Sequence, residues 1–326
     1  MKDKLLKMLS EAEGYVSGQR LCEELNVSRT AVWKNINRLK EEGYVIEAVP
    51  NKGYCLKERP DVINVPEIKS GLQTRYWGQE TIFFEEVDST NNVAKKMAEE
   101  GAPHGRLVIA ENQNAAKGRR GRTWSSPEGT GIWMTFILRP QIHPQAASML
   151  TLVAAMAVRK AVYTETGLET VIKWPNDIVA GGRKICGILT EMSAELEWIN
   201  YVVVGVGINA NIWKFPDEIS DKATSLFLET GRTVDRSRMV SAYGNAFEEY
   251  YNRFVETGNL SLLKEEYNSY LANFHNQVKI LDAGGDFVGI SKGINDAGEL
   301  VVTVAEGTER IVRSGEVSVR GIYGYV

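Results

Sequence analysis

Four cationic side chains crowd into a short stretch that also contains two glycines. Residues 113–124 read Gln-Asn-Ala-Ala-Lys-Gly-Arg-Arg-Gly-Arg-Thr-Trp, which places Lys117, Arg119, Arg120 and Arg122 within six residues. Guanidinium groups can hold phosphate in bidentate geometry, and glycines allow a ligand to approach the backbone closely. Like charges at this spacing repel one another, so we expect a loop that becomes ordered around an anion. A solvated basic loop or a nucleic-acid patch fits the spacing equally well.

Three further strings lie where apolar segments begin or end: Asp88–Asn92, Lys173–Asp177 and Val204–Asn209. The first opens a predicted helix, where free backbone N–H groups could grip a polar ligand, although capping alone explains such residues more often. The third carries two glycines inside a strand, which indicates that something lies against the backbone. Its missing third glycine disfavours a dinucleotide site. Lys184 follows in Arg-Lys-Ile-Cys-Gly, as a compact charge suited to phosphate or as an ordinary surface lysine.

The histidines do not join these strings. His104, His143 and His275 fall outside every motif, and no Ser-His-Asp or Cys-His arrangement is visible. A hydrolase is therefore disfavoured. The three cysteines are far apart and form no C-x-x-C pair, which argues against a zinc site or a disulfide framework. We expect a reducing, cytoplasmic environment, because there is no signal peptide and no stretch approaches the ~20 apolar residues of a membrane helix.

The first 60 residues read as short helices followed by a hairpin. Within residues 18–37, apolar positions recur at helical spacing on either side of Asn-Val-Ser, as in a helix-turn-helix, and Ser28 is a plausible N-cap for the second helix. The hairpin that follows would be a wing. Residues 1–60 carry 11 Lys and Arg against 9 Asp and Glu, which is a mild excess of positive charge. The predicted DNA-contacting residues are Ser28, Arg29, Thr30, Trp33, Lys34, Asn37 and Lys52. The alternative is a three-helix protein-interaction module.

The rest of the chain is expected to fold as a central domain and a small C-terminal one. At 326 residues it exceeds a single core, and we place the boundaries at 1–62, 63–273 and 274–326. In the middle region strands do not alternate regularly with helices, which favours a multidomain α+β class, with helices on one face of a mixed sheet. Expected helices cover 91–100, 145–166, 235–256 and 261–273. Short strands after residue 274 suggest a small β-barrel.

Taken together, the motifs resemble one family. Asp-Ser-Thr-Asn, Gly-Arg-Arg-Gly-Arg-Thr-Trp, Lys-Trp-Pro-Asn-Asp, Arg-Lys-Ile-Cys-Gly-Ile-Leu and Gly-Val-Gly-Ile-Asn occur here in the order seen in biotin–protein ligases. With the N-terminal reader attached, nearly the whole chain resembles the bifunctional ligase–repressors of bacteria. The resemblance implies a winged helix-turn-helix, a class-II-synthetase-like sheet and an SH3-like barrel. It also implies biotin and ATP as substrates, Mg²⁺ with ATP, a biotin carboxyl carrier protein, operator DNA, and a homodimer when the adenylate is bound.

The resemblance also implies roles for individual residues. Biotin would be bound by Ser89, Thr90, Asn91, Gln113, Lys117, Gly118, Arg119 and Lys184. The nucleotide would be bound by Arg122, Trp124, Asn176 and Asn209. Catalysis would fall to Arg119 and Lys184, which neutralise charge as biotin's carboxylate attacks the α-phosphate. Asp177 is our own candidate for orienting the carrier lysine or accepting its proton. The family's loop usually reads Ala-Gly-Arg-Gly-Arg. In this chain Ala116 stands in place of the glycine, and Lys117 stands in place of the first arginine. A position needing positive φ would tolerate the alanine badly.

Two other functions remain open from the sequence. A lipoate–protein ligase would share the adenylate chemistry but lack the arginine-rich loop and the DNA reader. A metabolite-sensing regulator without catalysis would use the central domain only to bind its effector.

Overall fold

The computed structural model describes residues 1–326 except 42, 59–60, 123, 282–284, 315–317 and 322–326. The chain divides into two compact units. One comprises Met1–Gly71 with Asp235–Arg238, and the other comprises Leu72–Val234 with Met239–Val326. The C-terminal strands thus group with the central sheet. The three-domain division with boundaries at 62 and 273 stays a prediction.

The first unit contains the expected helices and hairpin. Its elements are α1 (Lys2–Glu11), α2 (Gly18–Leu25), α3 (Arg29–Glu41), β1 (Val45–Val49), β2 (Gly53–Glu58) and α4 (Val65–Gly71). Asn26 makes the turn between α2 and α3 with a left-handed backbone, φ 52°, and Ser28 accepts the Ala31 N–H as the predicted cap. Leu21, Val32 and Ile36 bury the apolar faces of both helices in one core. The helix-turn-helix geometry therefore follows from the turn residue, the cap and the apolar spacing together.

The second unit is built on a seven-stranded mixed sheet. Its strands lie in the order β3-β4-β5-β9-β8-β7-β6. Their bounds are β3 Thr81–Val87, β4 Leu107–Gln113, β5 Gly131–Leu138, β6 Val171–Lys173, β7 Asp177–Ala180, β8 Arg183–Ala194 and β9 Ile199–Asn209. Only β3 and β4 run parallel, and the remaining neighbours are antiparallel. The mixed sheet is confirmed, and the four-residue β7 is the strand that the sequence did not reveal.

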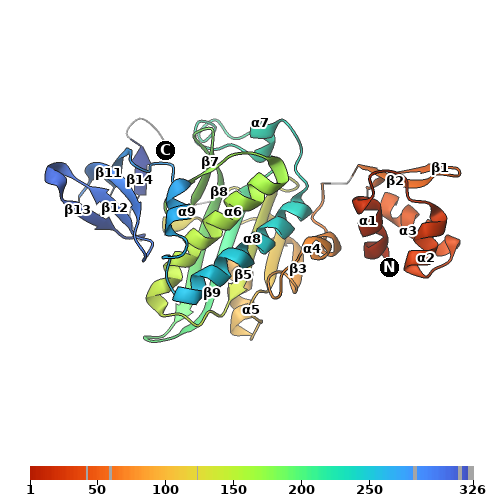
Figure 1. Ribbon diagram of the computed structural model, residues 1–326, viewed down its shortest axis with the longest axis horizontal. Helices are drawn as coiled ribbons and strands as arrows, with labels where there is room; N and C mark the ends of the chain where they lie inside the picture. The colour runs from red at the N-terminus through yellow and green to blue at the C-terminus, as the bar shows by residue number, and fades with distance from the viewer. Residues whose placement is uncertain (42, 59–60, 123, 282–284, 315–317, 322–326) are drawn as a thin grey trace. The chain divides into compact units, whose positions relative to one another are not determined.

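Helices cover both faces of this sheet, and the expectation of helices on one face is wrong. The helices are α5 Thr90–Glu99, α6 Leu150–Thr166, α7 Leu226–Thr230, α8 Arg236–Thr257 and α9 Lys264–Ser269. Phe136 of β5 stacks on Tyr243 and Phe247 of α8, whereas the adjacent Ile137 packs with Ala94 of α5. Successive strand residues point to opposite faces. Figure 1 shows α6 and α8 crossing the same face, where Lys160 and Glu249 join them at 2.6 Å.

The longest apolar helix lies in the core. Pro144–Thr166, which is the short 3₁₀ helix Pro144–Met149 followed by α6, is long and apolar enough to span a membrane by composition, contrary to expectation. Its most apolar window is 72% buried inside the protein, as in the core helix of a folded domain. Helix α9 is shorter than the predicted 261–273, because residues 270–273 leave the helix and Ala272 donates its N–H to Ile172 of β6.

The C-terminal strands form a separate five-stranded antiparallel sheet in the order β13-β12-β11-β10-β14. The bounds are β10 Gln277–Leu281, β11 Phe287–Ile294, β12 Leu300–Thr303, β13 Glu309–Val312 and β14 Ser318–Gly321. A turn of this sheet is tied to the central one, because Trp174 donates its indole N–H to the Gly298 carbonyl at 3.0 Å. The contact sets the C-terminal sheet beside the Lys-Trp-Pro-Asn-Asp string.

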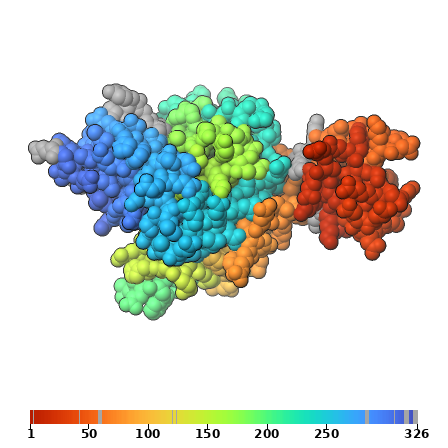
Figure 2. Space-filling view, viewed as in Figure 1, coloured from red at the N-terminus to blue at the C-terminus, as the bar shows by residue number. Residues whose placement is uncertain are grey.

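Two surface and core features complete the fold. The hairpin between β8 and β9 projects at its tip (Figure 2, green), where Leu196 is 94% and Trp198 57% exposed.

The three cysteines are free thiols: Cys22 and Cys55 are half-buried in the first unit, whereas Cys186 is buried in β8. Burial raises the pKa of the Cys186 thiol well above its ordinary value.

Candidate active site

All thirteen residues predicted to bind biotin or the nucleotide, or to take part in catalysis, line one cavity of about 550 Å³ on the central sheet. They are Ser89, Thr90, Asn91, Gln113, Lys117, Gly118, Arg119, Arg122, Trp124, Asn176, Asp177, Lys184 and Asn209. They come from the start of α5, the end of β4, the loop after it, and strands β7, β8 and β9. Because these segments lie far apart in sequence, only the sheet brings them together.

One end of the cavity is a neutral hydrogen-bonding wall. The Gln113 side-chain oxygen accepts the backbone N–H of Thr90 at 2.8 Å, and its amide nitrogen donates to Ser126 Oγ at 3.0 Å. Ser89 and Thr90 are 6% and 4% exposed. These contacts fix the orientation of groups that can both donate and accept, which suits a neutral ligand with an amide-like edge. Sequence reasoning missed Ser126, which carries no motif signal.

Asn91 is held by the protein on every polar atom. Its Oδ1 lies 2.7 Å from Thr135 Oγ1, and its Nδ2 donates to the Leu189 carbonyl at 3.2 Å and to Glu191 at 2.8 Å. Burial opposes ionisation of Glu191, but hydrogen bonds from Lys95 and Asn91 outweigh it and keep the pKa of that carboxyl below its usual range. Asn91 therefore ties α5 to the sheet beneath the cavity, rather than presenting an unused donor.

Trp124 lies on a floor made of glycines. A Cβ added to Gly187 or Gly207 would come 2.9 or 3.1 Å from its indole ring. The indole Nε1 is buried without a hydrogen-bond partner, and Lys184 Nζ stands 5.0 Å from the ring centroid. The two strand glycines predicted to admit something against the backbone thus admit side chains: Asn91 over Gly205 and Trp124 over Gly207.

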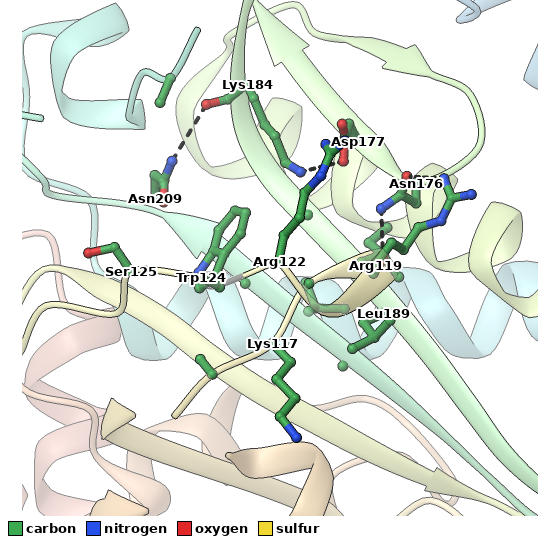
Figure 3. A pocket seen from close by; sticks show the side chains of 18 of the residues that line it. Lys117, Arg119, Arg122, Trp124, Ser125, Asn176, Asp177, Lys184, Leu189 and Asn209 are labelled. Carbon is green, nitrogen blue, oxygen red and sulfur yellow. Dashed lines mark hydrogen bonds and ion pairs between the residues drawn. The ribbon is translucent and has the colours of Figure 1, made fainter. Parts of the chain in front are cut away.

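The other end of the cavity is densely charged. Lys184 Nζ pairs with Asp177 at 2.5 Å. Arg119 donates to Asn176 Oδ1 at 3.0 Å, and Asn176 in turn donates to the Ile188 carbonyl at 3.0 Å. Figure 3 shows Arg122 extending toward Asp177, and Lys117 pointing away from these groups. Asn176 thus orients a guanidinium that could meet an anion.

Asn209 serves the same end of the cavity indirectly. Its amide nitrogen donates to the Thr224 carbonyl at 3.0 Å, and Thr224 donates its N–H to the Lys184 carbonyl. Asn209 thereby fixes the backbone beside Lys184.

The charge balance of the cavity is the feature that sequence reasoning most underestimated. Among its described lining residues eight are cationic and one, Asp177, is acidic. Four of the cations were not predicted: Lys173, Lys214, Lys222 and Arg320. Arg320 comes from β14 of the C-terminal sheet, a partner that linear spacing cannot indicate. Such an excess of positive charge favours a strongly anionic ligand such as a nucleotide phosphate.

Ala116 fits its position. It is 5% exposed, its backbone is not left-handed, and its carbonyl accepts the Trp124 N–H at 3.0 Å. The backbone at Ala116 therefore does not require the positive φ that an alanine would tolerate badly.

The predicted DNA-contacting residues lie on the outer surface of the first unit. Six of the seven belong to α3 or its cap, and Lys52 is exposed at the turn between β1 and β2. Trp33 is 55% exposed, a large apolar side chain left uncovered on a helix whose opposite side is buried. Arg29 donates to Gln19 of α2 at 3.0 Å, which holds it at the start of α3.

Comparison with known proteins agrees with this arrangement. Three family profiles match successive parts of the chain: an HTH domain at residues 2–55, the Biotin/lipoate A/B protein ligase family at 83–209, and the Biotin protein ligase C terminal domain at 276–320. The Bifunctional ligase/repressor BirA of Bacillus subtilis is 40% identical over 314 residues, which cover 95% of this chain and 96% of that protein. The chain belongs to the bifunctional biotin ligase/repressor family. It is an ATP-dependent biotin–protein ligase and a transcriptional repressor.

Other relatives extend the match. The protein of the same name from Escherichia coli is 31% identical over 97% of this chain and 96% of its own length. A solved structure, "Biotin protein ligase from Aquifex aeolicus in complex with biotin and ATP", matches with a TM-score of 0.66 and 30% identity, covering 74% of this chain and 99% of that one. A non-catalytic regulator and a lipoate ligase are therefore set aside.

Proposed function

We propose that the cavity carries out both steps of biotin transfer, with each step assigned to residues of this chain. The observation that supports it best is one cavity with a neutral hydrogen-bonding wall at one end and eight cations against one carboxylate among its described lining. Biotin offers a neutral ureido ring and an ionised carboxylate. ATP supplies the phosphates.

The neutral wall would bind the ureido ring. Ser89, Thr90 and Gln113 offer the donors and acceptors that one carbonyl and two N–H groups require. Backbone groups of Lys117, Gly118 and Arg119 would complete this wall. Asn91 would act as a positioning residue, since its own polar atoms are engaged.

In the first step the carboxylate oxygen attacks the α-phosphorus of ATP in line. A phosphorus–oxygen bond forms, the bond to the β-phosphate bridge breaks, and pyrophosphate leaves with that electron pair. No general base is needed, because the carboxylate is already ionised. The barrier is the approach of two anions, which Arg119 and Lys184 would lower by neutralising charge. Arg122 would face the phosphates, while Trp124 would cover adenine, and Asn176 and Asn209 would hold the surrounding groups.

Magnesium would enter with the nucleotide. The described residues contain no group of three or more His, Cys, Asp or Glu side chains that could hold a metal ion. This fits Mg²⁺, which is commonly held by substrate phosphates and water.

In the second step the amine of a carrier lysine attacks the biotinoyl carbonyl, and AMP leaves. The amine must first lose a proton from its ammonium form, whose free pKa is about 10.4. Asp177 is the acidic side chain in the described lining and would receive that proton, with Lys184 shifting from the carboxylate to the phosphate. The acceptor would be the biotin carboxyl carrier protein.

The first unit would read operator DNA as a winged helix-turn-helix. Thr30, Trp33 and Asn37 would meet base edges, while Arg29, Lys34 and Lys52 would hold phosphates. Repressors of this kind read two half-sites as dimers. The adenylate would order residues 117–124 and favour a homodimer. The central sheet would be class-II-synthetase-like and the C-terminal one SH3-like, and the protein would act in the cytoplasm.

Mass spectrometry tests the ligase chemistry directly. A carrier domain incubated with the protein, biotin and ATP should gain one biotinoyl group on a lysine. An unchanged carrier mass, with a functional ligase as positive control, would contradict the assignment.

Sedimentation tests the switch. The association constant should rise when a non-hydrolysable adenylate analogue is present, and by linkage the dimer should bind the analogue more tightly. Identical association constants in both conditions would leave a ligase that merely carries a DNA-binding domain.

A further inference from the structure

Thr135 carries a fully buried hydroxyl behind the neutral wall of the cavity. It lies in β5, is 0% exposed, and is not among the described residues that line the cavity. Its Oγ1 lies 2.7 Å from Asn91 Oδ1 and 2.9 Å from Thr90 Oγ1. A hydroxyl carries one hydrogen, so Thr135 can donate to only one of these oxygens. That choice decides which group Thr90 presents to a ligand.

The side-chain amide of Asn91 is held in one orientation. Its Nδ2 donates to the Leu189 carbonyl at 3.2 Å and to the ionised carboxylate of Glu191 at 2.8 Å, and neither group can donate in return. Lys95 pairs with the other carboxylate oxygen at 2.8 Å, which holds Glu191 in place. Asn91 Oδ1 therefore faces Thr135, and an amide oxygen can only accept.

The hydroxyl hydrogen of Thr135 is thus committed to Asn91. Thr135 Oγ1 can then only accept from Thr90, so Thr90 donates its own hydroxyl hydrogen to Thr135. Gln113 Oε1 is a second possible acceptor for that hydrogen at 3.1 Å, although it already accepts the Thr90 backbone N–H at 2.8 Å. With either acceptor the Thr90 hydrogen points into the protein, and only lone pairs of Thr90 Oγ1 remain for the cavity.

Thr90 and Gln113 then offer opposite hydrogen-bonding groups next to each other. Thr90 Oγ1 accepts, whereas the Gln113 amide nitrogen carries two hydrogens, of which one goes to Ser126 at 3.0 Å. The second hydrogen remains for a ligand. An acceptor beside a donor matches an N–H group beside a carbonyl, which is the edge of a cyclic urea or amide.

We propose that Thr135 is a specificity-determining residue that makes Thr90 a hydrogen-bond acceptor only, so that the cavity selects ligands with an N–H group at that point. Asn91 and Glu191 act with Thr135 as positioning residues. This rests on the proposed biotin site, in which the N–H group is one of the two in the ureido ring of biotin.

The cost of a wrong ligand follows from the same contacts. A ligand with an oxygen at that point would set lone pairs against those of Thr90. If Thr90 turned its hydroxyl hydrogen to the ligand instead, its oxygen would face that of Thr135 at 2.9 Å with no hydrogen between them. A buried polar mismatch of this kind weakens binding about 10- to 100-fold.

Calorimetry of the full chain with biotin and two cyclic carbamates tests this. In each carbamate a ring oxygen replaces one ureido N–H group of biotin, so the shape is kept and one hydrogen is lost. In the wild type the carbamate whose oxygen faces Thr90 should bind about 10- to 100-fold more weakly than biotin. In Thr135→Val the opposing oxygen is gone and Thr90 can turn its hydroxyl to the ligand. The penalty of that carbamate should then fall about tenfold, and the penalty of the other should not change.

Two variants assign the effect to the hydroxyl of Thr135. Thr135→Ser keeps the hydroxyl and should keep the wild-type penalties. Thr190→Val removes a matched hydroxyl, which bonds to Thr151 of α6 at 2.8 Å, and should also keep them. Loss of the penalty in either of these variants would overturn the proposal. Unchanged penalties for both carbamates in Thr135→Val, or equal gains for both, would overturn it as well.

The wild type alone provides a second test if Thr135→Val does not fold. Equal affinity for biotin and both carbamates would show that no acceptor is needed at Thr90, and would overturn the role of Thr135 while leaving the biotin site intact. Absence of biotin binding by the wild type would instead sink the proposed biotin site, and this inference with it.

Discussion

Gly205→Ala should destabilise the second unit by forcing a methyl group into Asn91. The ideal Cβ at this position would lie 2.1 Å from Asn91 Oδ1 and 2.9 Å from its Cγ. Asn91 cannot move aside freely, because it contacts Thr135, Leu189 and Glu191 through hydrogen bonds of 2.7–3.2 Å. Overpacking costs about 1–3 kcal/mol and buried polar groups left unpaired add about 1–3 kcal/mol, so the expected loss is about 2–6 kcal/mol.

Urea unfolding followed by tryptophan fluorescence measures this loss. Six of the seven tryptophans belong to the second unit, so the signal reports mainly on it. The matched control is Gly207→Ala, whose methyl group would meet the Trp124 ring at 3.1 Å. A ring can yield by a few tenths of an ångström, so this variant should lose less than about 1 kcal/mol.

A double-mutant cycle tests the stated cause. In an Asn91→Ala background the obstacle is gone, and the further cost of Gly205→Ala should fall below about 1 kcal/mol. An undiminished cost in that background would refute the argument that Asn91 is what the methyl group strikes.

Three further predictions follow from contacts of single side chains. Lys184→Ala should lower single-turnover biotinoyl-AMP synthesis about 100-fold or more by removing positive charge at the phosphate, with unchanged circular dichroism; unchanged synthesis would remove it from the site. Trp174→Phe should cost about 1–3 kcal/mol in urea unfolding, because the Gly298 carbonyl loses its buried partner, and an unaltered unfolding free energy would count against that bond. Neutral His104 accepts the Arg139 N–H, and burial, with a smaller effect of Arg139, lowers the pKa of His104. Its contribution is present above pH 6.5 and is lost as pH falls below that value, so between pH 7.5 and 5.5 the wild type should lose more unfolding free energy than His104→Asn; equal losses would contradict this.

Much of the fold could be predicted because burial leaves a strong mark on sequence. The mostly apolar, fully buried run of β5 marked a strand, and short strands separated by turns predicted four of the five C-terminal strands but not β14. The Asn26 turn with its Ser28 cap did the same for the helix-turn-helix. The motif strings could be grouped because they occur in the order seen in biotin–protein ligases, whereas each string alone left a structural role open.

The remainder depends on tertiary neighbours. Periodicity shows that a residue is buried but does not show which face of the sheet it covers, so the expectation of helices on one face was wrong for α5. The strand β7, at four residues, is shorter than the pattern needed to recognise it. Arg320 reaches the cavity from the C-terminal sheet. Asn91 is held by hydrogen bonds to residues as far as 100 positions away in sequence. No local signal carries such contacts.

Because Cys186 is buried, the rate at which its thiol is alkylated in the native protein reports how often this part of the structure opens. Its thiol sits in β8 next to Gly187 on the cavity floor, so an alkylating reagent can reach it only when that strand separates from its neighbours. Cys22 and Cys55, half-exposed in the other unit, should be modified first and without such separation. The delay before the third alkylation therefore measures the opening free energy of the cavity floor in unmodified protein. A ligand seated on that floor should lengthen the third delay alone.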